Sequence, residues 1–259
     1  MKSVQQMKAT HLMSSSLRAG DPSYAVAVTK KQYESDYPPF YVAVDIVVLT
    51  VRDEKLQVMA IRRGRGPGIG ELALPGGFVK IDEDLEAAAR RELVEETNLE
   101  FEFLEQVKTY GAPDRDPRGR NVSVSYVAVV PNLPEGEAGT DAAEALWVPA
   151  DILTATDLPF DHNLMLADAV ERARAKLEYS PLAASFCGDT FTIGQLRRVY
   201  EIVWGKDKNA IDPSNFQRKV LSAEGFLVAT GEVISDGPGR PAREYQLGRA
   251  TVLNPPVTR

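Results

Sequence analysis

The sequence of 259 residues has little of what would place it in a specialised class of protein. It has a single cysteine, Cys187, so an internal disulfide is excluded and a reducing compartment such as the cytoplasm is expected. No run of about 18 apolar residues is present, so we expect no membrane span. The first 16 residues lack the apolar core of a signal peptide, which argues against secretion.

Positive charge is also scarce, with 30 Lys+Arg against 37 Asp+Glu and a formal net charge of −7. Averaged over the chain, this balance argues against nucleic acid as a partner. The average hides a division, because residues 1–182 hold 20 basic and 29 acidic side chains, whereas residues 183–259 hold 10 and 8. The C-terminal segment is therefore slightly basic. The length predicts between one and two domains.

The first part of the chain shows the patterns of a mixed α/β domain. Residues 40–51 and 56–61 are apolar and β-branched, and four polar residues separate them, which predicts a β-hairpin. A helix is expected over residues 84–97, and a connecting helix over 162–177 has apolar side chains at helical spacing. Further strands are expected over residues 101–110, 122–130 and 145–148.

The last part of the chain has a different order of elements. Thr192 and Gln195 have the spacing of a capping box at the start of an amphipathic helix. Asp212 followed by Pro213 predicts the start of a second helix. Two short strands, 227–233 and 242–247, flank a tip rich in turn residues. Helix, loop, helix and β-hairpin are the elements of a winged helix-turn-helix domain.

A cluster of carboxylates carries the clearest chemical signal. Glu92, Glu95 and Glu96 fall within an arc of roughly 100° on the expected helix, at the border of its apolar side. Carboxylates placed there repel one another and lose solvation, and a hard divalent cation such as Mg²⁺ or Mn²⁺ relieves both costs. Arg91 precedes Glu95 by four residues and is spaced to orient it. The alternative is a solvated acidic helix face.

The spacing of these residues resembles the Nudix box, Gly-x5-Glu-x7-Arg-Glu-(apolar)-x-Glu-Glu-x-Gly-(apolar), from Gly77 to Leu99. One fixed position differs, because Asn98 stands where the family has glycine, and asparagine also suits a left-handed helix end. The resemblance implies a mixed β-sheet between helices and a metal-dependent hydrolase of nucleoside diphosphate derivatives. It implies these roles: Glu92, Glu95 and Glu96 as catalytic and metal-binding carboxylates, Arg91 as an orienting catalytic residue, and Glu83 and the Gly77 backbone as further metal ligands.

Arginines around the box are candidates for binding the diphosphate of a ligand, because a guanidinium binds phosphate bidentately. Arg62 and Arg63 precede the box, and the backbone of Gly76 lets a phosphate approach closely. The turn-rich loop after the box adds Arg115, Arg118 and Arg120. For this loop the alternative is an ordinary solvated turn. We interpret His162 as a packing residue at the start of the connecting helix.

A DNA-reading surface is predicted on the helix that starts at Pro213. Its buried face is expected at Phe216 and Val220, so the opposite polar face is presented to the major groove. The wing is expected to reach a phosphate or the minor groove. The alternative for this domain is docking or dimerisation. The predicted DNA-binding residues are Ser214, Asn215, Arg218, Lys219, Arg240 and Arg243.

Four segments, 158–162, 191–202, 215–220 and 239–245, together with the box, resemble the NrtR family of Nudix-related transcriptional regulators. The resemblance implies a homodimeric repressor of NAD-metabolism genes that binds double-stranded operator DNA. It also implies a Nudix domain that senses ADP-ribose or a related dinucleotide. The residues leave ADP-ribose, NAD and a sugar phosphate open as effectors.

The runner-up function is a Mg²⁺-dependent Nudix pyrophosphohydrolase acting on ADP-ribose or a similar compound, with or without a regulatory role.

The two resemblances together give the expected domain organisation. The expected boundaries are a partly mobile N-terminal arm over 1–37, a Nudix domain over 38–160, a connecting helix over 161–180, a winged helix-turn-helix domain over 181–250 and a C-terminal tail over 251–259.

Overall fold

The computed structural model describes residues 39–100, 104–131, 133, 142–234 and 241–259. The predicted N-terminal arm, the first residues of the strand expected from 101, and Arg240 lie outside the described residues. The chain from Phe40 to Arg259 forms one compact unit. None of the described helices is long and apolar enough to cross a membrane.

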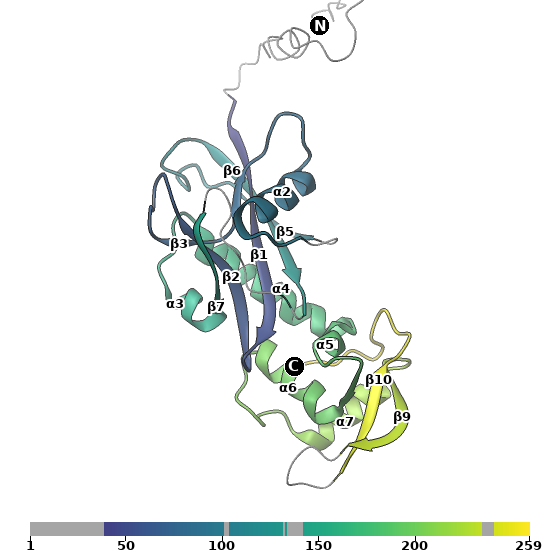
Figure 1. Ribbon diagram of the computed structural model, residues 1–259. Helices are drawn as coiled ribbons and strands as arrows, with labels where there is room; N and C mark the ends of the chain where they lie inside the picture. Colours follow the sequence, from purple (N-terminus) through teal and green to yellow (C-terminus); the bar gives the residue numbers. More distant parts are fainter. Residues whose placement is uncertain (1–38, 101–103, 132, 134–141, 235–240) are drawn as a thin grey trace, which may run out of the picture. The chain divides into compact units, whose positions relative to one another are not determined.

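A mixed β-sheet forms the centre of the first part (Figure 1). Strand β1 (Tyr41–Arg52) pairs antiparallel with β2 (Lys55–Arg63) and parallel with β6 (Asn121–Val129). The predicted hairpin is confirmed, and both residues of its turn have positive φ, as a type I′ turn requires. The remaining strands of this sheet are β3 (Leu72–Ala73), β4 (Gly76–Phe78), β5 (Glu105–Tyr110) and β7 (Ala142–Pro149).

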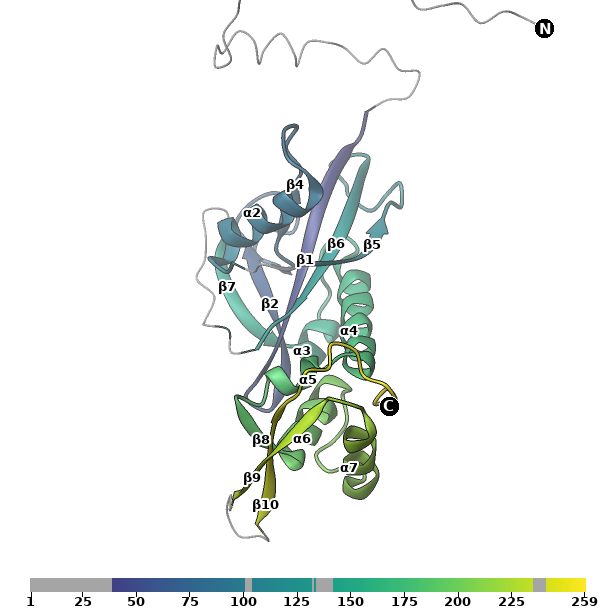
Figure 2. The same ribbon diagram turned by 90° about the vertical axis from the view of Figure 1, so that its right-hand side faces the viewer.

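Two helices cover opposite faces of this sheet, α2 (Leu85–Thr97) and α4 (His162–Tyr179) (Figure 2). Alternate side chains of β1 point to the two faces, because side chains alternate along a strand. Val44 packs in the core with α2, whereas Val47 packs in the core with α4. The fold predicted from the Nudix box is therefore confirmed. A short helix, α3 (Ala150–Ala155), was not predicted.

Helix α2 begins and ends as its sequence predicts. The side chain of Asp84 accepts a hydrogen bond from the Ala87 amide at 2.8 Å, so it caps the helix. Asn98 ends the helix in the left-handed conformation, with φ of 53°, and its amide donates to the carbonyl of Val94. The departure from the Nudix box at position 98 therefore keeps the helix end that a glycine would make.

The second part is a winged helix-turn-helix. Helices α6 (Ile193–Val203) and α7 (Pro213–Ser222) are followed by the hairpin of β9 (Leu227–Ile234) and β10 (Ala242–Leu247). The capping box at Thr192 and the cap at Asp212 are both present. A short helix, α5 (Leu182–Ser185), and a third strand, β8 (Thr190–Thr192), which pairs with β10, were not predicted.

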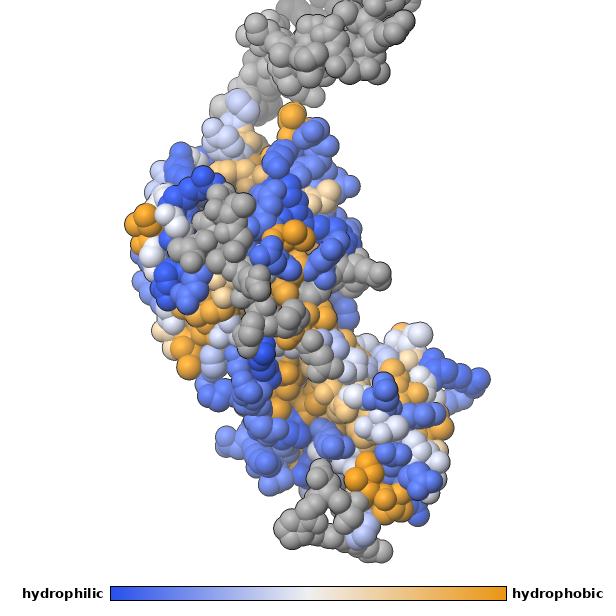
Figure 3. Space-filling model, in the orientation of Figure 1, coloured by the Kyte–Doolittle hydropathy of each residue, from blue (hydrophilic) through white to orange (hydrophobic). Residues whose placement is uncertain are grey.

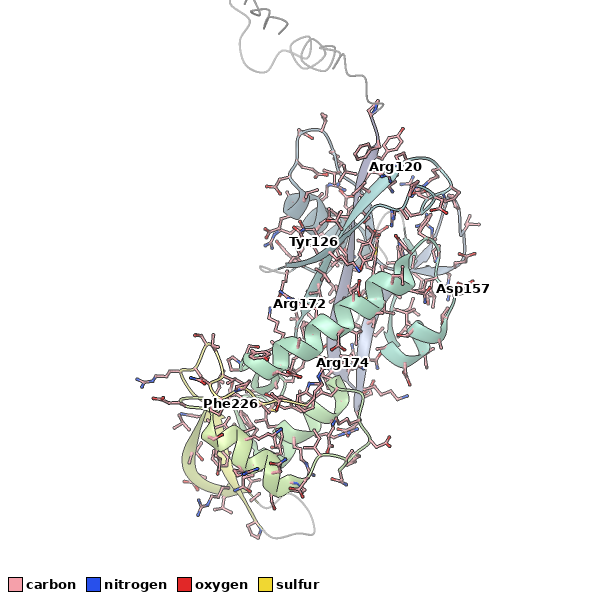
Figure 4. The ribbon with its side chains drawn as sticks, turned by 180° about the vertical axis from the view of Figure 1, so that it is seen from behind. Arg120, Tyr126, Asp157, Arg172, Arg174 and Phe226 are labelled. Carbon is pink, nitrogen blue, oxygen red and sulfur yellow. The ribbon has the colours of Figure 1, made fainter. Side chains whose placement is uncertain are left out.

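Helix α4 joins the two parts through direct contacts with α6. The Tyr200 hydroxyl donates to the carbonyl of Leu177 at 3.0 Å. Arg174, which is labelled in Figure 4, donates from its guanidinium to the carbonyl of Val203 at 3.0 Å. One hydrophobic cluster includes Val47 of β1 and Phe216 of α7. The sheet, α4 and the winged helix therefore share a continuous core.

The C-terminal tail lies against α4 and also contacts α7 (Figure 2). The amides of Leu253 and Val257 each donate to a carbonyl of the last turn of α4 at 2.9 Å, and both side chains are buried. Arg259 forms an ion pair with Glu171 of α4 at 2.6 Å. On the other side, the ammonium of Lys219 donates to the carbonyl of Thr258 at 2.7 Å. The tail thus fixes α7 to α4.

Candidate functional site

A polar cleft of about 590 Å³ lies where α2, β4, the loop after β5 and the start of α4 meet. Its volume lies within the ~300–1,000 Å³ of most small-molecule sites. Both carboxylates and arginines line it. We therefore treat this cleft as the candidate ligand site.

Helix α2 brings Glu92, Glu95 and Glu96 to the cleft, and the guanidinium of Arg91 contacts the first two of them and also Glu83, which precedes the helix. Arg91 donates to Glu92 at 2.6 Å, to Glu95 at 3.1 Å and to Glu83 at 2.9 Å. Each contact is charge-assisted, so Arg91 offsets the repulsion among these carboxylates. The predicted orienting role of Arg91 agrees with this geometry.

Glu96 lies deeper than the other box carboxylates and is 7% exposed. Burial raises its pKa to about 8, because the charged form loses solvation. The Gly76 amide, which donates to Glu96 at 2.8 Å, opposes this rise, whereas the negative charges of Glu92 and Asp45 add to it. A protonated Glu96 is therefore populated near neutral pH.

The carboxylates of the box are the candidate ligands for a divalent cation. Their oxygens are the type that Mg²⁺ and Mn²⁺ prefer. However, within the described parts of the chain, no three His, Cys, Asp or Glu side chains are arranged to hold a metal ion. Glu92 and Glu95 point to Arg91 instead, and Glu96 to a backbone amide. The arrangement described here therefore does not fit a metal, and the predicted metal ligands stay a prediction.

Neither Gly76 nor Gly77 has room for a Cβ atom, but the obstacles differ. A Cβ at Gly76 would lie 2.3 Å from the carbonyl oxygen of Val44, whereas one at Gly77 would lie 2.3 Å from a carboxylate oxygen of Glu92. The first obstacle is backbone in the central strand, and the second is the end of a side chain. The two glycines thus allow β4 to lie against β1 and the Glu92 carboxylate to lie against β4.

We expect Gly76→Ala to destabilise the fold by more than about 3 kcal/mol, because β1 cannot move aside without loss of pairing. Gly77→Ala should cost less than about 1 kcal/mol, because the Glu92 carboxylate rotates away. Urea unfolding of both variants beside the wild type measures the difference. Equal losses would contradict this reading of the two contacts.

Only some of the predicted ligand arginines reach the cleft. Arg63, Arg115 and Arg118 line it, but Arg115 is buried and its Nε donates to Asp161 at 2.9 Å. The other two lie outside its lining, because Arg62 pairs with Glu144 at 3.1 Å and Arg120 donates to the Gly111 carbonyl at 2.9 Å. Arg63 and Arg118 are therefore the guanidinium groups best placed for a ligand.

The floor of the cleft contains residues that the sequence did not single out, above all Asp45. Its carboxylate accepts a hydrogen bond from the Ser123 hydroxyl and lies 3.3 Å from Nε2 of His162. Burial alone would raise the pKa of Asp45, but His162, Ser123 and Arg115 outweigh it and hold the pKa below its usual range. The only sequence signal was a lone charged residue within an apolar run.

His162 is the first residue of α4 and is buried, as predicted for a packing residue. It also accepts a hydrogen bond from the Leu74 amide at Nδ1, over 3.1 Å. That bond leaves Nε2 to donate to Asp45. The start of α4 is thereby fixed to β1 and to the residues just before β4.

The predicted DNA-reading face of α7 is exposed. Ser214, Asn215 and Arg218 are exposed, while Phe216 and Val220 are buried, as the periodicity predicted. Short polar groups with arginine on an open helix face suit the major groove. The side chain of Asn215 accepts from Arg218 at 2.7 Å, so the two act as a pair.

The other predicted DNA-binding residues are less simply placed. The ammonium of Lys219 donates a hydrogen bond to the carbonyl of Thr258 in the tail, so in this arrangement it is not directed to a phosphate. Arg243 is exposed on β10, and apolar side chains are visible at the surface of the winged-helix part (Figure 3). Arg240 lies outside the described residues. Val228, Val233 and Leu247 of the hairpin are exposed apolar residues.

Comparison with known proteins agrees with this architecture. Residues 40–169 match the NUDIX domain, and residues 183–247 match the NrtR DNA-binding winged helix domain. The chain is similar to the ADPR responsive transcriptional repressor NtrR of Acinetobacter baylyi. It is 34% identical to that protein over 218 residues, which span 83% of this chain and 85% of the relative.

Two solved structures are also similar to this chain. The Shewanella oneidensis NrtR complexed with a 27mer DNA has a TM-score of 0.61 at 31% identity and covers 80% of this chain and 93% of its own. The NUDIX domain of that NrtR, complexed with ADP ribose, has a TM-score of 0.52 at 30% identity and covers 57% and 97%. Fold and site thus define a Nudix domain coupled to a DNA-binding winged helix. The chain belongs to the NrtR family of Nudix-related transcriptional regulators.

Proposed function

We propose that this protein is a homodimeric repressor of NAD-metabolism genes that binds operator DNA and senses ADP-ribose, or a related dinucleotide, in its Nudix cleft. The observation that carries the proposal is the path of α4. Its first residue, His162, lines the cleft, and its last turns bond to α6 of the winged helix. A protein acting on chromosomal DNA works in the cytoplasm, where the single cysteine suits the reducing conditions.

The charges of the cleft support a diphosphate ligand. Arg63 and Arg118 line it, and they interact unfavourably with each other, because the positive charge of Arg118 adds to burial in lowering the pKa of Arg63. An anion between the two guanidinium groups would relieve that repulsion. The relative from Acinetobacter baylyi is described as ADPR responsive, which supports ADP-ribose.

Ligand binding can change DNA binding only if the two arrangements of the winged helix bind the ligand with different affinity. The cleft end of α4 is held by Asp45 and Leu74 at His162 and by Arg115 at Asp161. A ligand that moves any of these groups changes the position of α4. The contacts of α4 with α6 and with the tail carry that change to α7.

The test is an electrophoretic mobility shift with DNA from upstream of the protein's own gene, with and without ADP-ribose. We expect retarded DNA at low salt, and a change in apparent Kd of about 5- to 150-fold on adding ADP-ribose. NAD and ribose 5-phosphate serve as ligands for comparison. No retardation of any native promoter at low salt would overturn the repressor proposal.

Pyrophosphohydrolase activity stays the second candidate, because three box glutamates, Glu92, Glu95 and Glu96, line the cleft. In the described arrangement, Arg91 holds Glu92 and Glu95, which favours sensing over hydrolysis. Incubating ADP-ribose with Mg²⁺ or Mn²⁺ and measuring AMP separates the two functions. AMP release that Glu96→Gln abolishes would establish the hydrolase, and a wild type as inert as the variant would exclude it.

A further inference from the structure

In the cleft, the flat guanidinium of Arg118 packs against two phenyl rings, those of Phe78 and Phe160. The Cζ of Arg118 lies over the ring of Phe78, 4.8 Å from its centroid, and over the ring of Phe160, 5.2 Å from its centroid. All three side chains line the cleft. Ring centroids in aromatic pairs lie about 4.5–7 Å apart, so a flat heterocycle placed where the guanidinium lies would stack on both rings.

The backbone of Phe160 is held in an unfavourable conformation. Its φ is +60°, a region that a bulky residue other than glycine rarely adopts. Strain of this kind persists where the surroundings fix it, often at ligand sites. Here it directs the ring to a place between Arg118 and Arg63, whose Cζ lies 5.1 Å from the same centroid. Packing alone does not require a half-buried ring at such a position.

We propose that Phe78 and Phe160 form the subsite for the nucleobase of the ligand, and that the base takes the place now held by the Arg118 guanidinium. The proposal rests on the proposed function and names which part of the dinucleotide these two residues recognise. A stacked base contributes more than a surface guanidinium, because its larger ring loses more contact with water.

The present partners of Arg118 permit this exchange. Its guanidinium donates to Asp116 at 2.7 Å, and its side chain is 41% exposed. When the guanidinium leaves, the buried Asp116 keeps two donors, the Arg118 amide at 2.9 Å and the Asn121 side chain at 3.1 Å. Asp116 is therefore not left unpaired. The released guanidinium is within the cleft, where it can bind the diphosphate of the same ligand.

The test measures binding of ADP-ribose and of ribose 5-phosphate, which lacks a base, by titration calorimetry. Phe160→Leu and Phe78→Leu remove the flat ring but keep apolar volume. Each should weaken ADP-ribose binding by about tenfold to a hundredfold, the loss typical of one stacked base. Binding of ribose 5-phosphate should stay unchanged. Phe160→Tyr, which keeps the ring, should bind ADP-ribose with the affinity of the wild type.

The matched control is Phe40→Leu. Phe40 also lies under an arginine, with Arg120 at 5.5 Å from its centroid, but it is outside the cleft lining. This variant should bind both ligands as the wild type does. If the wild type binds ADP-ribose and both Leu variants bind it equally well, the stacking proposal fails while the proposed function stands. If the wild type binds neither ADP-ribose nor NAD, the sensing part of the proposed function fails, and the stacking proposal fails with it.

Discussion

Replacing Arg218 by alanine is expected to weaken operator binding by about 10- to 100-fold and to relax the preference for the operator over unrelated DNA. Arg218 is exposed on the open face of α7 and is oriented by Asn215 at 2.7 Å. An arginine held in this way is suited to a bidentate bond with a guanine edge. Quantitative mobility shifts at fixed salt, with operator and scrambled DNA, measure both effects.

Lys219→Ala is the control for this prediction. Lys219 is the next residue of the helix and carries the same charge, but its ammonium is bonded to Thr258 of the tail. It should therefore change operator affinity less than about threefold and leave the specificity ratio unchanged. A loss at Lys219 as large as that at Arg218 would mean that the tail leaves α7 when DNA binds.

Glu96→Gln is expected to make the protein more stable than the wild type at pH 9 and equally stable at pH 4. In the folded state the pKa of Glu96 is raised to about 8 from 4.5. Below the lower value, both states hold the proton. Between the two values only the folded state holds it, so wild-type stability falls as the pH rises. Above pH 8 the full cost of a buried charge remains.

The amide of glutamine is neutral throughout and still accepts from the Gly76 amide, so the variant avoids this cost. The gain at pH 9 should reach about 5 kcal/mol, the cost that corresponds to a pKa raised from 4.5 to about 8. Urea unfolding at both pH values, with a chelator present, measures it. Glu71→Gln, at an exposed carboxylate outside the cleft lining, should show no such gain. A Glu96→Gln variant that is less stable at pH 9 would contradict the assigned cause.

The sequence predicted those features that depend on local patterns. Asp84 and Asn98 cap the two ends of α2 as expected, and α6 begins at the capping box of Thr192. Periodicity also separated the buried Phe216 from the exposed Arg218. Each of these predictions needs only a few neighbouring residues, because caps and helix faces are set within one or two turns.

The sequence could not predict features that depend on distant partners. Asp45 becomes a site residue because His162, which is 117 positions later, folds onto it. The loop after β5 has three arginines that look alike in sequence, and Asp161 decides that Arg115 is structural. The tail looked like an ordinary end, yet Leu253 is buried against the molecule. Such pairings arise only from the tertiary fold.

The continuous core described above also limits how this architecture can be rearranged. Val47 of the sensing part and Phe216 of the DNA-reading part belong to one cluster, so a genetic crossover near residue 182 would cut through it. A winged helix transferred to another sensor would need to bring α4 and the C-terminal tail with it. Sensor and reader are therefore expected to be inherited together, and new effector specificity to arise by substitutions within the cleft.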